Sequence, residues 1–106
     1  MKLLHLTFHF EYREAMEEIL DEHGVQNYVV YPMMEGKDID GKHFGSKIHP
    51  GNVSVIEAQV EEDQIEPLFE KLSEFKHAKR SRYHLEALIL PIERKIEREV
   101  KLKREE

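Results

Sequence analysis

The chain has 106 residues, the usual size of one domain, and it contains no cysteine, which excludes disulfides, thiolate nucleophiles and cysteine-ligated zinc. The net charge of −6 argues against nonspecific nucleic-acid binding, and no apolar run reaches membrane-spanning length, so neither nucleic acid nor membrane insertion is expected. A reducing, cytoplasmic setting follows from the absent cysteines, and the 36% of charged residues resembles the surface of a thermophile protein.

The first third of the chain predicts a strand, a helix and a second strand. Residues 2–10 alternate between apolar and polar side chains, which is the period of a half-buried strand. Residues 12–23 carry apolar side chains at helical spacing, and Gly24 follows as a C-terminal cap. Residues 28–31 are β-branched or aromatic and stop at Pro32, which indicates a short strand. The buried face expected for the first strand consists of Leu4, Leu6, Phe8 and Phe10.

A long loop is predicted after the second strand. Residues 33–52 contain four of the five glycines in the chain and show little periodicity. The segment is longer than most connections inside compact domains, and loops of such length are usually functional or mobile. We therefore expect residues 33–52 to take part in function.

The remaining half predicts a strand, a helix, a strand and a tail. Residues 53–61 alternate again, with Ser54, Ile56, Ala58 and Val60 on one face. A helix is expected from Asp63, because apolar residues then recur at helical spacing as far as Phe75. A basic connector precedes a last strand over residues 83–90, and the charged residues 92–106 predict a short helix. The apolar stripe of the second helix consists of Ile65, Leu68, Phe69, Leu72 and Phe75.

The order of these elements predicts an α+β, ferredoxin-like βαββαβ domain over residues 1–91, followed by the tail at 92–106. In this fold a four-stranded antiparallel sheet carries both helices on one face. The other face would be bare and partly apolar. Self-association into a closed oligomer is therefore expected.

Three segments resemble the PII signalling family. "VSVIEAQVEEDQIEPLFEKL", residues 53–72, is similar to the third strand and second helix of those proteins, and "LILPIERKI", residues 88–96, resembles the closing strand and the start of the tail. Residues 33–52 stand in the place of the family's T-loop. The resemblance implies a homotrimer that binds a small effector (an anion, a nucleotide or a metal) at subunit clefts. It also implies that the loop signals to a partner protein, either a membrane transporter or an enzyme.

The effector site is expected at the only basic cluster, formed by Lys76, Lys79, Arg80 and Arg82, if this cluster lies next to a subunit cleft. Lys79, Arg80 and Arg82 could hold phosphate or carboxylate groups, with Gly36 contributing from the loop. The alternative is a solvated turn that balances the acids of the second helix. Nucleotide-binding PII proteins carry a glycine-rich phosphate loop at this position, but residues 77–84 read "HAKRSRYH". ATP binding of the family's usual kind is therefore not expected.

Seven histidines raise a metal hypothesis. His43 and His49 lie in one loop and could converge on a transition metal, or they could be solvated. His9, like His5, could meet its own copies around a threefold axis, or could simply line an interface. The similarly shaped CutA proteins, which are trimers linked to divalent metals, are thus an alternative, with a role in metal binding or tolerance. No nucleophile signature or isolated carboxylate pair is present, so the chain is not expected to be an enzyme.

Overall fold

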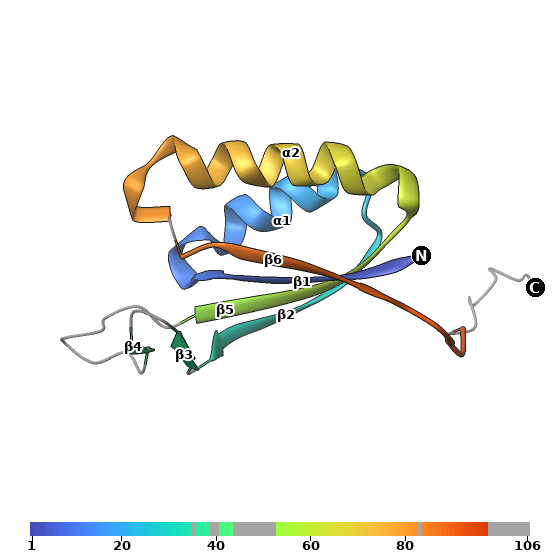
Figure 1. Cartoon of the computed structure of the whole chain (residues 1–106), viewed down its shortest axis with the longest axis horizontal. Coiled ribbons are helices and arrows are strands. Elements are labelled where there is room, and N and C mark those ends of the chain that lie inside the picture. The colour runs from blue at the N-terminus through green and yellow to red at the C-terminus, as the bar shows by residue number, and fades with distance from the viewer. Residues whose placement is uncertain (35, 39–40, 44–52, 83, 98–106) are drawn as a thin grey trace, which may run out of the picture.

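In the computed structural model, which describes residues 1–34, 36–38, 41–43, 53–82 and 84–97, a four-stranded antiparallel sheet carries two helices on one face (Figure 1). The strand order is β2-β5-β1-β6, which confirms the predicted α+β ferredoxin-like fold. The elements are β1 (Lys2–His9), η1 (Phe10–Tyr12), α1 (Arg13–Glu22), β2 (Asn27–Met34), β3 (Gly36–Asp38), β4 (Gly41–His43), β5 (Val53–Val60), α2 (Glu62–Ala78), η2 (Arg80–Arg82) and β6 (Glu86–Pro91).

The inner strand β1 pairs with β5 on one side and β6 on the other. Alternate residues of β1 and β5 are buried, as the period-two pattern predicted, and Leu6 lies opposite Ile56 in the register. Phe10 is a correction. The strand ends at His9, the backbone turns into the 3-10 helix η1, and the Phe10 side chain is left 39% exposed.

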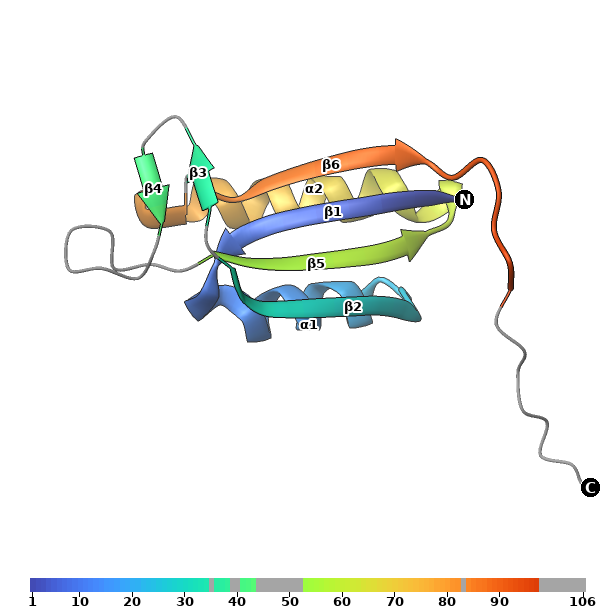
Figure 2. The same cartoon turned by 90° about the horizontal axis from the view of Figure 1, so that it is seen from below.

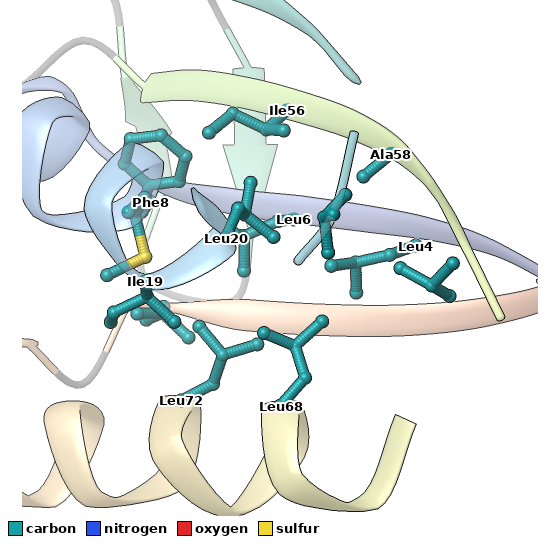
Figure 3. Packing of buried hydrophobic residues seen from close by; sticks show 13 residues of the cluster. Leu4, Leu6, Phe8, Ile19, Leu20, Ile56, Ala58, Leu68 and Leu72 are labelled. Carbon is teal, nitrogen blue, oxygen red and sulfur yellow. The ribbon is translucent and has the colours of Figure 1, made fainter. Parts of the chain in front are cut away.

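The hydrophobic core lies between the sheet and the helices (Figure 3). Side chains of β1 and β5 point toward the helices, and those of α1 and α2 point back toward the sheet, so the two sets meet between the layers. Because each strand buries one side only, the core is a single layer and the lower face of the sheet stays uncovered by the described elements. The labelled core residues are Leu4, Leu6, Phe8, Ile19, Leu20, Ile56, Ala58, Leu68 and Leu72.

One junction fixes the end of α1 and the start of α2. Gly24 caps α1 with a φ of +78°, a conformation that favours glycine, and confirms the predicted cap. At the start of α2 the Gln64 side chain accepts a hydrogen bond from the Glu61 backbone N–H (2.8 Å) and donates one to the Gly24 carbonyl (3.0 Å). Neither α1 nor α2, the two α-helices of the described ranges, is long and apolar enough to cross a bilayer.

The segment predicted as a loop contains regular structure. Strand β2 continues past Pro32 to Met34 through an irregularity in its pairing with β5, which an edge strand tolerates. The buried Ser54 hydroxyl donates a hydrogen bond to the Pro32 carbonyl and ties the two strands together there. The short strands β3 and β4 then form a hairpin. Residues 44–52 lie outside the described part of the chain.

The predicted tail helix does not include residues 92–97, which form neither helix nor strand. The Lys95 ammonium lies 2.5 Å from the Gln59 side-chain oxygen and 3.0 Å from a Glu97 carboxylate oxygen. This part of the tail therefore contacts the end of β5. The rest of the predicted helix, residues 98–106, lies outside the described residues.

Candidate functional site

Several segments meet at one end of the sheet, which we call the loop end and define as Phe10–Tyr12, Met34, Val53 and Lys79–Arg82. Antiparallel pairing brings them together, because β1 and β2 finish where β5 begins. Helix α2 also finishes at this end, and the β3–β4 hairpin lies there (Figure 2). The fold thus places the predicted basic cluster and the base of the predicted loop at the same end of the molecule.

Arg82 is held within the loop end by aromatic rings. Its guanidinium carbon lies 3.6 Å from the centroid of the Phe75 ring and 5.3 Å from that of Tyr12, and its Nη1 donates a hydrogen bond to the Phe75 carbonyl (3.1 Å). Its buried Nε has no hydrogen-bond partner among the described residues. Arg82 therefore joins α2, η2 and η1, and its predicted contact with an effector stays a prediction.

Lys79 and Arg80 differ from Arg82 because both side chains are exposed. Lys79 has an extended backbone that ends α2, so the two cations stand at the C-terminal end of that helix. The helix dipole favours cations at this end. Stabilisation of α2 is therefore the alternative explanation for the two charges, in place of effector binding. Within the described residues neither side chain forms an ion pair, so both charges are available to an anion.

The other predicted site residues fall in different places. Gly36 and His43 are register partners across the β3–β4 hairpin, which brings these two positions together. His49 lies outside the described residues. The His9 ring stacks on Phe10 with centroids 4.8 Å apart, and its Nδ1 accepts a hydrogen bond from the Glu11 backbone N–H (3.3 Å).

The metal predictions stay predictions, because His49 and the His43 side chain lie outside what the structure describes and the predicted His9 site requires other copies of the chain. His9 serves as the cap of η1, and the described residues contain no group of three side chains that could hold an ion.

The uncovered side of the sheet, which we call the open face, is apolar at its flanks. Val29 on β2 is 53% exposed and Leu88 on β6 is 49% exposed, and both belong to the row of residues that crosses the sheet through His5 and Glu57. Figure 2 looks onto this face and shows all four strands uncovered. The open face includes Leu3, His5, Thr7, Asn27, Val29, Tyr31, Val55, Glu57, Gln59, Glu86, Leu88 and Leu90.

A polar group lies at the centre of the open face, and the sequence analysis missed it. The Tyr31 hydroxyl donates a hydrogen bond to Glu57 Oε1 (3.2 Å), and His5 Nδ1 lies 3.2 Å from Glu57 Oε2. The hydrogen bond to Glu57, followed by the negative charge of that carboxylate, raises the pKa of Tyr31. Only the register between β1 and β5, which sets His5 opposite Glu57, could have revealed this group.

Solved structures with similar backbones are nitrogen-regulatory PII-like proteins. CPII from Thiomonas intermedia K12, bound to ADP, AMP and bicarbonate, matches with a TM-score of 0.68 and 23% identity over 83% of this chain and 81% of that chain. The apo form of CPII matches with a TM-score of 0.64 and 22% identity, over 83% and 84% of the two chains. The chain has the PII-like fold. The resemblance seen in the sequence is thereby confirmed at the level of the fold.

A more distant PII-like match comes from another organism. A candidate PII-like signaling protein from Thermus thermophilus has a TM-score of 0.58 and 15% identity, over 83% of this chain and 80% of that chain. A scan against protein-family models found no match, and a search of curated proteins found none either. The PII-like fold is therefore preserved here at low sequence identity.

Proposed function

We propose that this protein is a PII-like regulator that binds a small anionic effector at the loop end and signals to a partner protein through residues 33–52. The observation that carries the proposal is the pair of exposed cations, Lys79 and Arg80, at the same end of a PII-like fold as the loop. Arginine can bind a carboxylate or phosphate through two parallel hydrogen bonds, and lysine adds a point charge.

The backbone near these cations restricts how an anion can bind. In glycine-rich phosphate loops the backbone N–H groups cradle the ligand. Here the Arg82 N–H donates to the Lys79 carbonyl (3.0 Å) and the Leu85 N–H to the Arg82 carbonyl (3.1 Å), so both donors are already used. These two N–H groups are therefore not open to a ligand, and the proposal assigns recognition to the side chains of Lys79 and Arg80. This favours a compact anion or one phosphate group, and the ligands bound to CPII supply natural test compounds.

The same proposal includes assembly into a homotrimer through the open face. Val29 and Leu88 leave apolar surface on both sides of the sheet centre, and we expect copies of the chain to cover this surface in a closed assembly. A trimer would also turn the loop end into a cleft between subunits. The CutA-like alternative depended on His43 and His49, whose side chains are not described, so no observation favours it.

Isothermal titration calorimetry with ADP, AMP and bicarbonate tests the proposal. We expect at least one of these to bind, and the double variant K79Q/R80Q to weaken binding by roughly tenfold or more, since hydrogen bonds to charged groups contribute about 1.5–3 kcal/mol each. The variant K71Q, at an exposed lysine of α2, serves as the matched control. Absence of binding by all three compounds, or equal binding by the double variant, would contradict an anion site at the loop end.

A second readout follows the loop itself. Residues 33–52 contain Lys37, Lys42 and Lys47, which are sites for trypsin. A ligand that acts through the loop must bind one loop state more tightly than the other, so the bound effector should slow or speed cleavage at these lysines. Cleavage that is unchanged at saturating effector would separate binding from signalling.

A further inference from the structure

The centre of the open face holds one histidine in a fixed orientation. His5 and Glu57 are each about one-third exposed (33% for both side chains), and the imidazole Nδ1 lies 3.2 Å from Glu57 Oε2. The second oxygen of the same carboxylate accepts the Tyr31 hydroxyl at 3.2 Å. Glu57 is therefore held from two sides, and the ring plane of His5 is set by a carboxylate that is itself anchored.

This hydrogen bond decides which ring nitrogen carries the lone pair. An ionised carboxylate only accepts hydrogen bonds, so Nδ1 of a neutral His5 is the protonated nitrogen and Nε2 is the free base. Among the described residues Nε2 has no hydrogen-bond partner. A carboxylate on one nitrogen and an open lone pair on the other is the arrangement found in metal-binding histidines.

A single His5 cannot hold an ion alone, and the described residues of one chain contain no group of three possible ligands. Its neighbours in the cross-sheet row are Glu57 on β5 and Leu88 on β6, followed by Val29 on β2. Further ligands must then come from other copies. His5 lies near the middle of β1, one of the two inner strands of the sheet, and we expect it to face the axis of a closed trimer whose open faces turn inward.

We propose that His5 Nε2 from three copies binds one borderline transition-metal ion, of the zinc or nickel class, on the axis of the assembly. Three imidazoles with an open fourth position suit such ions, and the apolar side chains of Val29 and Leu88 would limit water access around the site. Glu57 and Tyr31 act as positioning residues. This inference rests on the assembly proposed above.

Metal stoichiometry on the full-length, chelator-stripped protein tests the inference. Equilibrium dialysis against zinc or nickel, read by elemental analysis, should give one ion per three chains, and H5Q should lose it. E57Q should keep the stoichiometry but weaken affinity by roughly 10- to 100-fold, because the carboxylate orients the ring. H77Q, at an exposed histidine at the end of α2, is the matched control and should bind as the natural sequence does.

Sedimentation of the same samples separates the two proposals. A trimer that takes up no metal, or binds it independently of His5, overturns the inference and leaves the proposed assembly standing. A chain that stays monomeric with and without metal overturns both. Binding of one ion per chain that survives H5Q also rejects the axial site.

Discussion

Tyr31 shows how one exposed side chain is tuned by a neighbour. Its hydroxyl donates to Glu57, and this hydrogen bond together with the carboxylate charge favours the neutral phenol and raises its pKa above the usual 10.0. The folded state therefore gains stability that is complete below pH 10.0 and is lost as the pH rises through the raised pKa. Ultraviolet titration of E57Q should show the Tyr31 transition moving back toward 10.0, with Y31F identifying that transition. Identical curves for E57Q and the natural sequence would refute this coupling.

Single residues also show what the sequence could and could not predict. Alternation identified Leu4, Leu6 and Phe8 as buried, because the period of a strand sorts side chains by face. It failed at Phe10, where the chain leaves the strand although the apolar pattern continues. Arg82 was predicted either to bind an anionic effector or to lie in a solvated turn. Its stacking on Phe75 depends on how η2 folds back on α2, which residue type and spacing do not encode.

At the scale of elements, Gln64 links two helices that are far apart in the chain. It completes the cap of α2 and donates to the Gly24 carbonyl at the end of α1. Q64A should lower the free energy of unfolding by about 1–2 kcal/mol, because both a capping bond and a hydrogen bond to a helix end are lost. Urea unfolding followed by circular dichroism measures this. Q26A, an exposed residue just after α1, should change it little, and equal losses in the two variants would argue against the junction.

The order and type of the main elements followed from periodicity, but short irregular elements did not. Strands β3 and β4 contain three residues each and two glycines between them, too little for an alternating pattern to appear. Pro32 predicted the end of β2, yet β2 is an edge strand and continues past it. The tail was predicted as a short helix over residues 92–106, although residues 92–97 are irregular.

At the scale of the molecule, the order of elements was enough to predict a sheet with one bare face. The polar group on that face could not be predicted, because period two fixes which residues share a face within a strand but not the offset between strands. His5, Glu57 and Tyr31 belong to three different strands and meet only through the observed register. The candidate effector residues Lys79 and Arg80 were found from charge alone, and the fold supplied their place beside the loop.

The central claim is that copies of this chain cover the open face, and the mass of the protein in solution tests it most directly. Sedimentation equilibrium should give three times the chain mass of 12.6 kDa for the natural sequence. The double variant V29E/L88E, which adds carboxylates on both sides of the sheet centre, should sediment as a single chain, while K71E on the outer side of α2 should remain a trimer. A natural sequence that sediments as a monomer at all concentrations would contradict the account.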